Sequence, residues 1–414
     1  MDAQTITDAY VYLLSRALVV RQEHIDRDEE GFAYNQVKYN PLGSADFVNP
    51  NFDVAYLEGW IAVDADHPVV LEVPKVEGRY YTAQILDEWG EVIVNINERT
   101  FPSKPFGAFA LTLPGSSPAL PAGATRIDLH SSKAKLLARV ELKGDPTGAL
   151  TLQKQFVLTA QGAPRIAEPP QMPPFSNQTL IGAELFDLAE AVFASALDVS
   201  PHAAQMQQQV RAVAVHIASS DDARAAADKQ IHGQIVPAFQ EFAFTKSAPQ
   251  HEGWVGGAPD MGNYGVNYWL RATVNYLGIW ANTTEEVIYF TTNRDALGQR
   301  LDGGKGYVIH FPPDQLPDSV VDAYWSVILV DAADFRVVPN RLARFNLNNQ
   351  SPLQKEADGS LKIAIGAMPV AGVPEANWLP SAEGKAYSLT FRAYVPKEVV
   401  KQGAWAPPGL APVA

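Results

Sequence analysis

Short runs of Val, Ile, Tyr and Thr, separated by Pro, Gly and Asn, fill two separate stretches of this 414-residue chain. The first stretch includes PVVLEVP, RYYTAQIL, EVIVNI and FALTLPG, and the second includes GYVIHFPP, AYWSVILVD and AYSLTFRAYVP. Strands of this length, with turn signals at this spacing, are typical of all-β sandwiches or barrels, and we favour sandwiches. The sequence therefore predicts one antiparallel β-sandwich at residues 31–162 and a second at 284–414.

The two stretches also resemble each other. In LEVPKVEGRYYTAQILD (71–87) and IHFPPDQLPDSVVDAYWSVILVD (309–331), a strand ends in Pro, and a loop, an aromatic pair and finally Asp follow. Asp87 and Asp331 each stand seven residues after the first aromatic residue of the pair. Because the pattern occurs in both stretches, it favours duplicated sandwiches and predicts equivalent positions for the two aspartates.

The remaining segments carry helical signals. Residues 1–30 have apolar side chains at helical spacing, and residues 179–283 continue that spacing over several turns. Between the first sandwich and this second helical segment lies a Pro-rich connector, APRIAEPPQMPPFSNQ (163–178). We therefore expect a mainly β protein with helices, in which a helical segment joins the two sandwiches.

The composition excludes several classes of protein. A formal charge of −14 without a Lys/Arg cluster argues against a nucleic-acid partner. The absence of Cys excludes disulfides, thiolate nucleophiles and Cys-based metal sites. No apolar run is long enough to span a membrane, and the acidic first residues make a poor secretion signal. We expect a cytoplasmic protein, or a periplasmic one if a leader has been removed.

Common cofactor motifs are missing from the chain. None of the 8 His residues has a partner at the spacing of HEXXH-type zinc sites, and no GXXXXGK[ST], strand-linked GXGXXG or GXSXG motif occurs. We therefore expect no metal and no cofactor, while a metal held by carboxylates alone stays open.

Asn51 and Asp53 precede a run, VAYLEGW, that alternates like a half-buried strand. In strand alternation Asp53 shares the apolar side with Ala55 and Leu57, where a carboxylate is costly to bury unless it is hydrogen-bonded. Two interpretations stay open: Asp53 caps a turn ahead of the strand, or it is kept for chemistry as a general base.

Polar residues also share strand faces further along the chain. Alternation places Arg79, Tyr81 and Asp87 on one face of a strand, and Asn95 and Arg99 on one face of the next. The two arginines could clamp a carboxylate or phosphate of a substrate. The alternative is a solvated sheet face with cross-strand ion pairs.

With these segments assembled, the chain resembles a bacterial two-domain family catalogued as domains of unknown function twelve-fifty-four, in the N-terminal half, and twelve-fourteen, in the C-terminal half. The resemblance rests on PNFD with Tyr56, GRYYTAQILD, GVNYWLRA, YVIHFPP, NWLP and FRAYVP, in this order. It implies two jelly-roll-like sandwiches joined by helices, and no settled reaction. The family's usual PN-x-D-T-L-Y run has Val54 and Ala55 here, so any Thr hydroxyl used there is missing.

We hypothesise a cofactor-independent acid–base enzyme, a hydrolase or lyase, that acts on a small anionic or ring-containing organic molecule. The candidate catalytic residues are Asp53, Tyr56 and Tyr81, and the candidate substrate-binding residues are Asn51, Arg79, Asp87, Asn95 and Arg99. The rival hypothesis is a non-catalytic carbohydrate-binding or assembly protein built from tandem jelly rolls, because such folds host both classes. In either case we expect a homo-oligomer.

Overall fold

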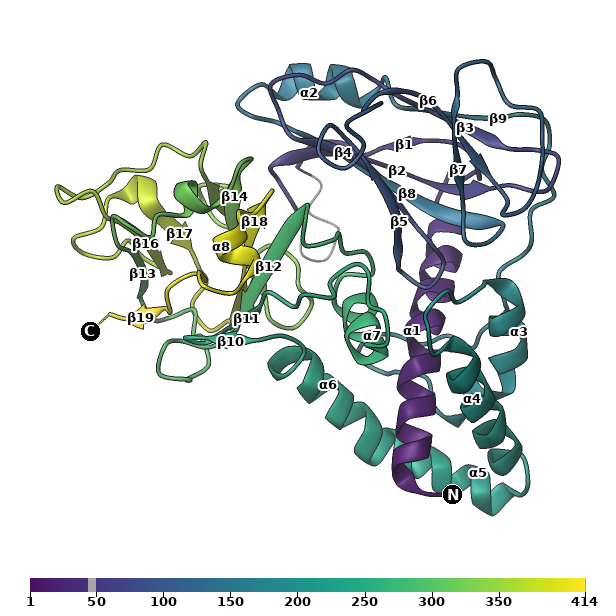
Figure 1. Ribbon diagram of the computed structural model, residues 1–414. Helices are drawn as coiled ribbons and strands as arrows, with labels where there is room; N and C mark the ends of the chain where they lie inside the picture. The colour runs from purple at the N-terminus through teal and green to yellow at the C-terminus, as the bar shows by residue number, and fades with distance from the viewer. Residues whose placement is uncertain (44–49, 414) are drawn as a thin grey trace.

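The computed structural model describes residues 1–43 and 50–413. Figure 1 shows three regions: strands of the N-terminal half at the upper right, strands of the C-terminal half at the left, and helices below and between them. The chain is a mixed protein of helices and open, largely antiparallel sheets.

The N-terminal half consists of two facing sheets with strand orders β1-β2-β8-β4-β5 and β7-β6-β3-β9. Alternate residues of β2, such as Ala55, Leu57 and Ile61, pack with Leu71 of β3 and Phe109 of β6 in the core between the sheets. This is the alternation that the sequence shows. The strands are β1 (Lys38–Tyr39), β2 (Val54–Ala62), β3 (Val69–Val73), β4 (Tyr81–Leu86), β5 (Val92–Ile96), β6 (Gly107–Thr112), β7 (Thr125–Asp128), β8 (Lys133–Glu141) and β9 (Val157–Ala160).

The C-terminal half has the sheets β10-β11-β12-β18-β14-β15 and β17-β16-β13-β19. Its core again lies between the two sheets, with Ile309 and Ile363 on one side and Val327 and Phe391 on the other. The strands are β10 (Gln250–His251), β11 (Trp254–Gly256), β12 (Val287–Thr292), β13 (Tyr307–Phe311), β14 (Trp325–Asp331), β15 (Asn346–Asn348), β16 (Leu361–Gly366), β17 (Trp378–Pro380), β18 (Tyr387–Tyr394) and β19 (Ala411–Pro412).

The two halves repeat one topology. The orders β2-β8-β4-β5 and β7-β6-β3-β9 recur as β12-β18-β14-β15 and β17-β16-β13-β19. A short helix stands between the last two strands of each half: α2 (Pro146–Gln153) between β8 and β9, and α8 (Glu398–Lys401) between β18 and β19. The expectation of purely antiparallel sheets is wrong at one place in each half, because β6 pairs with β7, and β16 with β17, in parallel.

Asp87 and Asp331 lie at equivalent positions in this repeat. Asp87 follows β4 directly and Asp331 ends β14, the corresponding strand. Each carboxylate accepts the backbone N–H two residues ahead: Asp87 from Trp89 at 2.8 Å and Asp331 from Ala333 at 2.9 Å. The shared turn confirms the repeat that the sequence predicts.

The helices pack against the outer face of the N-terminal sheet. The long α1 contacts α4 and α7, and its apolar side chains share one core with Trp60 and Leu86 of the sheet and Trp89 of the turn after β4. The segment 179–283 is not helical throughout, because it contains β10 and β11. These two strands extend the C-terminal sheet. The helices are α1 (Ala3–Arg27), η1 (Ala183–Leu188), α3 (Ala189–Ser195), α4 (Ala203–Ile217), α5 (Asp221–Gln230), the π turn η2 (Ile231–Ile235), α6 (Val236–Thr245), α7 (Tyr268–Leu277), and the short η3 (Pro317–Val320) and η4 (Glu375–Asn377).

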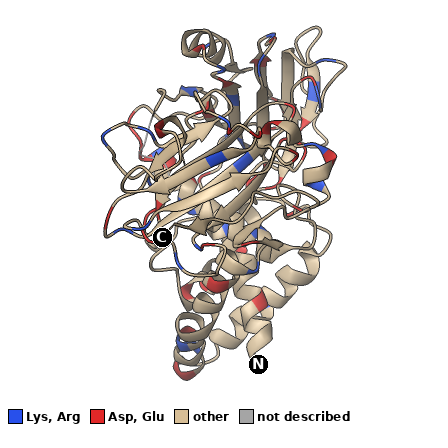
Figure 2. Cartoon of the chain, turned by 90° about the vertical axis from the view of Figure 1, so that its left-hand side faces the viewer, with Lys and Arg blue, Asp and Glu red and all other residues tan. Residues whose placement is uncertain are grey.

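Figure 2 shows acidic and basic residues interspersed along the chain. Within the described residues, no helix is both long and apolar enough to cross a membrane.

Candidate functional site

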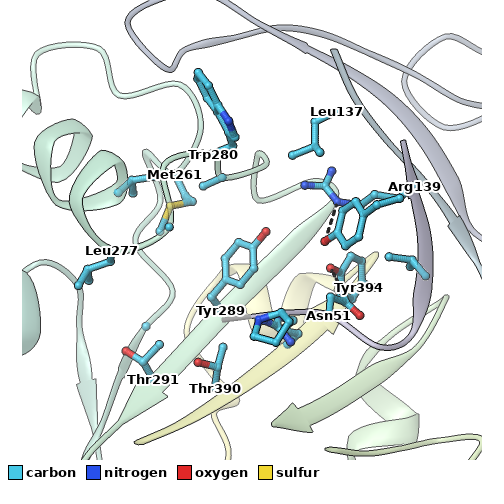
Figure 3. Close-up of a pocket in the computed structure, with 18 of the residues that line it drawn as sticks. Asn51, Leu137, Arg139, Met261, Leu277, Trp280, Tyr289, Thr291, Thr390 and Tyr394 are labelled. Atoms are coloured by element: carbon cyan, nitrogen blue, oxygen red, sulfur yellow. Dashed lines mark hydrogen bonds between the residues drawn. The ribbon is translucent and has the colours of Figure 1, made fainter. Parts of the chain in front are cut away.

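A cavity of about 250 Å³ lies where the two halves and the helices meet. β2 and β8 contribute one wall, β12 and β18 another, and α6, α7 and the segments on either side of α7 a third, called the helical wall below. In Figure 3, Arg139, Tyr394 and Asn51 gather at one end of the cavity, while Met261 and Leu277 lie on the helical side. The apolar lining comprises Val54, Leu137, Ala243, Ala248, Val255, Met261, Leu270, Val274, Leu277, Trp280 and Ala281, and the polar lining includes Asn40, Asn51, Tyr56, Glu58, Arg139, Ser247, Thr273, Tyr289, Thr291, Thr390, Arg392 and Tyr394. The cavity therefore combines a largely apolar wall with a polar end.

Arg139 is the central charge of the polar end, and its side chain is 2% exposed. Its Nη1 donates to Gln84 Oε1 at 2.8 Å and its Nε to the Tyr56 hydroxyl at 3.5 Å. The guanidinium also lies 5.5 Å from the centre of the Tyr56 ring. These partners are neutral, and no carboxylate in the described part of the chain lies within ion-pair distance of Arg139.

The other cations on the same face of β8 are neutralised by α1. Lys133 Nζ lies 2.6 Å from Glu23, and Lys135 Nζ lies 2.8 Å from Asp26. Lys135 also pairs with Glu58 at 2.8 Å. Arg139 stands further along this strand face, where the cavity replaces α1 as the neighbour. A buried charge is costly unless a counter-charge accompanies it, and among the described residues Arg139 is hydrogen-bonded to the neutral groups of Gln84 and Tyr56.

The repeat brings a matching set of side chains from each half to this region. In the N-terminal sheet, Arg139 is directly opposite Tyr56 on β2 and Thr82 on β4. Asn97 extends this set, because its Nδ2 donates to Thr82 Oγ1 at 3.1 Å. We call these four residues the N-terminal row.

The C-terminal row consists of Tyr289, Arg392, Ser326 and Asn348. Arg392 is directly opposite Tyr289 on β12 and Ser326 on β14, and Ser326 is opposite Asn348 on β15. Across equivalent strands, each row therefore carries the same types of residue in the same order: Tyr, Arg, Thr or Ser, and Asn. Tyr and Arg of both rows line this same cavity.

Each half also sends a carboxylate into the other half's row. Asp53 directly precedes β2, and its Oδ1 accepts the amides of Asn346 at 2.7 Å and Asn348 at 2.6 Å. Glu286 directly precedes β12, the equivalent strand, and accepts from Asn97 Nδ2 at 2.9 Å. Each carboxylate is therefore bound by the half to which it does not belong, and we call the two acids exchanged. Their contacts fix how the halves meet.

Burial dominates the electrostatics of this interface. It raises the pKa of the Asp53 carboxyl, against the opposing effects of Asn348, Ser326 and the charge of Arg392. Burial likewise raises the pKa of Tyr289 and holds that of Tyr394 well above its usual value, so both hydroxyls stay protonated at neutral pH. Burial lowers the pKa of Arg139, but the opposing effect of Tyr56 and the neighbouring tyrosines leaves it above its usual value, and the guanidinium is charged at neutral pH.

Of the residues that the sequence singles out, Asn51 and Tyr56 line the cavity. Asn51 joins the halves, because its Nδ2 donates to the Tyr394 hydroxyl at 2.8 Å. Its Oδ1 accepts the Asp53 N–H at 2.8 Å, which is the turn that one interpretation of the sequence predicts. Asp53 itself does not line the cavity, although the next residue, Val54, does. Asp53 is 5% exposed.

The other candidates lie away from the cavity wall. Tyr81 belongs to the core between the N-terminal sheets and donates to the Pro105 carbonyl at 2.8 Å. Arg79 pairs with Asp145, the N-cap of α2, at 2.8 Å. Asp87 and Asn95 make polar contacts at the edges of the outer sheet face.

Asp87 contacts His130 Nδ1 at 2.7 Å, while Asn95 donates to Asn282 at 2.9 Å. Arg99 pairs with Glu286 at 2.7 Å. Hence the predicted clamp of Arg79 and Arg99 is not assembled at the cavity: one arginine is at α2 and the other at the interface between the halves.

Sequence reasoning missed Arg139, Gln84, Tyr289 and Arg392. The run LLARVEL shows Arg139 as one more cation on an alternating strand, and nothing in it tells a paired cation from an unpaired one. A usable signal existed in the spacing of Asp53 to Tyr56, which recurs as Glu286 to Tyr289.

No group of three or more His, Asp or Glu side chains that could hold a metal ion occurs among residues 1–43 and 50–413.

Comparison with known proteins reflects the two-part organisation. The family model described as "Protein of unknown function (DUF1254)" matches residues 32–160, and the one described as "Protein of unknown function (DUF1214)" matches residues 286–398. The crystal structure of the VPA0106 protein from Vibrio parahaemolyticus is 21% identical, covers 100% of both chains and has a TM-score of 0.69, which shows a shared fold.

A structure of an uncharacterised protein from Burkholderia cenocepacia is 14% identical and covers 98% of this chain and 87% of its own, with a TM-score of 0.47 that is too low to carry an argument. No curated protein matches the chain.

Proposed function

Because the chain belongs to the family that joins a DUF1254 region to a DUF1214 region, its function must be argued from its own cavity, and we propose that this cavity binds a small amphipathic organic anion. The observation that carries the proposal is the charged, buried Arg139, which lines the cavity and has only neutral partners among the described residues. An anionic ligand group would supply the missing counter-charge.

The rest of the lining supports an apolar ligand body. Met261, Leu277 and Trp280 stand on the helical wall, away from the guanidinium, and Leu137 lies beside it on β8. A ligand whose charged group contacts Arg139 would lay its ring or chain against these side chains. Aryl and alkyl carboxylates of modest size have this chemistry.

We further propose that the bound anion undergoes acid–base conversion, of the hydrolase or lyase type. Tyr56 and Tyr289 support this, because both hydroxyl-bearing side chains line the cavity in equivalent places of the two rows. Tyr56 is already hydrogen-bonded to Arg139, which would bring its hydroxyl next to a bound anionic group.

The rival proposal of carbohydrate binding receives less support from the lining. A sugar presents hydroxyls around its whole rim, whereas the helical wall of this cavity is largely apolar. Jelly-roll-like topology for each half, a homo-oligomeric state and a cytoplasmic location stay proposals drawn from the sequence.

Calorimetric titration with benzoate and hexanoate tests the binding proposal, with benzamide and hexanamide as neutral counterparts of the same shape. We expect the carboxylates to bind and the amides to bind at least tenfold more weakly, since charge-assisted hydrogen bonds contribute about 1.5–3 kcal/mol. Arg139→Gln should abolish the preference for the anion, whereas Arg126→Gln, at an exposed strand residue paired with Asp128, should leave it unchanged. Equal binding of acid and amide by the wild-type protein would refute the proposal.

A further inference from the structure

The contact between Arg99 and Glu286 makes the two rows unlike each other. The Glu286 side chain is fully buried and accepts from Arg99 Nη2 at 2.7 Å, from Asn97 Nδ2 at 2.9 Å and from the Tyr80 hydroxyl at 2.9 Å. Arg99 also lies over the Tyr80 ring, with its guanidinium carbon 4.9 Å from the ring centre. Arg99 and Tyr80 thus both bind Oε2 of Glu286, while Asn97 binds Oε1.

The C-terminal row lacks a counterpart of Arg99. Arg99 follows Asn97 by two residues, and the residue that follows Asn348 by two is Gln350. In that row the exchanged acid is Asp53, bound by Asn348 and Asn346, and the cation whose charge acts on it is Arg392. The exchanged carboxylate of this row, which has Gln350 where the other has Arg99, thus lies within electrostatic range of the arginine of the row.

The repeat places Glu286 and Arg139 in the corresponding relationship. Glu286 precedes β12 as Asp53 precedes β2, and Arg139 occupies on β8 the place of Arg392 on β18. Tyr80, which is hydrogen-bonded to Glu286, is also within electrostatic range of Arg139. Glu286 nevertheless pairs with Arg99, and Arg139 keeps neutral partners.

We propose that Arg99 is a positioning residue: by pairing with Glu286 it prevents that carboxylate from neutralising Arg139, and so reserves Arg139 for the anionic group of the ligand. This inference rests on the proposed function of the cavity. Arg99 does not line the cavity and would not touch the ligand, so its effect is carried by Glu286 alone.

The test is a double-mutant cycle with benzoate titrated by calorimetry. Arg99→Gln, which installs the residue found at the equivalent place of the other half, should weaken benzoate binding at least tenfold because Glu286 is released toward Arg139. Adding Glu286→Gln to Arg99→Gln should restore the affinity to within about threefold of the wild type, since no carboxylate is left to compete. Benzamide binding should change little in both variants.

A purely structural role for Arg99 would give a different pattern. If Arg99→Gln leaves benzoate affinity unchanged while Arg139→Gln abolishes it, the positioning role is overturned and the proposed function stands. If the double variant binds as weakly as Arg99→Gln, the effect does not pass through Glu286 and the inference is wrong.

Two further results complete the design. Should Arg99→Gln fail to fold, Glu286→Gln alone decides the matter: the inference expects it to keep benzoate affinity, and a loss would overturn it. A wild-type protein that binds neither benzoate nor hexanoate would instead overturn the proposed function itself.

Discussion

Asp53 and Glu286 occupy equivalent positions immediately before β2 and β12, and each carboxylate is bound by an asparagine of the opposite half. Such a reciprocal arrangement resembles the isologous contact of a symmetric dimer, here formed within one chain. It answers why a carboxylate stands ahead of a half-buried strand. Asp53 ties the N-terminal half to Asn346 and Asn348 of the C-terminal half, beside the cavity.

We expect Asp53→Ala to lower the free energy of unfolding by about 2 kcal/mol, because two asparagine amides lose their acceptor. Asp53→Asn should cost less, about 1 kcal/mol or below, since its carbonyl oxygen can still accept from Asn346 and Asn348. Urea unfolding of the two variants and the wild type measures the difference. Equal losses would contradict the role of Oδ1 as the shared acceptor.

The same two variants address the catalytic hypothesis for Asp53. If Asp53 acts as a general base, Asp53→Asn removes turnover of a cavity ligand while its stability stays near that of the wild type. If Asp53 only joins the halves, both variants retain turnover in proportion to the fraction that is folded. Turnover measured beside the unfolding curves separates the two roles.

Much of the fold could be predicted from the sequence, because strand alternation and turn residues act locally. Spacing alone pairs Asp87 with Asp331, and the structure places them in equivalent turns. The two parallel strand pairs could not be predicted, because β7 and β17 are short and their partners are chosen by tertiary contacts. The departure of β10 and β11 from the helical segment was missed for the same reason.

The candidate site was predictable only in part. Alternation places Tyr81 and Gln84 on opposite faces of β4, yet it does not say which face meets the cavity, and the face of Tyr81 is the sandwich core. The sequence likewise does not show that α1 neutralises Lys133 and Lys135 but stops short of Arg139. Which cation has only neutral partners among the described residues depends on contacts between distant elements.

Titration of Glu91 should lower the free energy of unfolding as the pH rises from about 4.5 to about 7. Burial, opposed by Arg271 and assisted by Asp87, raises the pKa of its carboxyl to about 7 from 4.5. Between these two values the folded protein retains a proton that the unfolded chain has released, so the free energy of unfolding declines with increasing pH. Above about pH 7 this contribution is constant.

Glu91→Gln should remove that part of the pH dependence, which amounts to at most about 3 kcal/mol. Urea unfolding of wild type and variant at pH 5 to 8 checks it, because the contributions of other titrating groups cancel in the difference. We expect the variant to gain relative stability toward pH 7. A difference that does not vary with pH would show that the carboxyl of Glu91 titrates normally.

Both the backbone conformation at position 90 and the side chain packed against it require glycine. Its φ is +94°, and a Cβ at this position would lie 2.7 Å from Asn275 Oδ1. Asn275 cannot move aside without losing its hydrogen bonds to the carbonyls of Ser15 and Trp89. Gly90→Ala should therefore lower the free energy of unfolding by about 3 kcal/mol, from backbone strain and overpacking together.

Gly115→Ala is the matched control for Gly90→Ala. Gly115 also has a positive φ, of +74°, but none of the described residues comes within 4 Å of the place that a Cβ would take there. Its substitution should cost about 1 kcal/mol, from the backbone alone. If both variants lose the same stability in urea unfolding, Asn275 does not limit the space at Gly90.

A series of linear carboxylates from butanoate upward should report the depth of the apolar wall. If the carboxylate contacts Arg139 and the chain lies against Met261, Leu277 and Trp280, each added methylene should tighten binding about fourfold, or about 0.8 kcal/mol. Affinity should then level off or fall once the cavity of about 250 Å³ is filled. Calorimetric titration of the series gives both the slope and the break.

Arg139→Gln should weaken the binding of every carboxylate in the series by a similar factor and leave the slope unchanged, because the guanidinium contacts only the common anionic group. A slope that disappears with Arg139 would show that the chain of the ligand does not occupy the apolar wall.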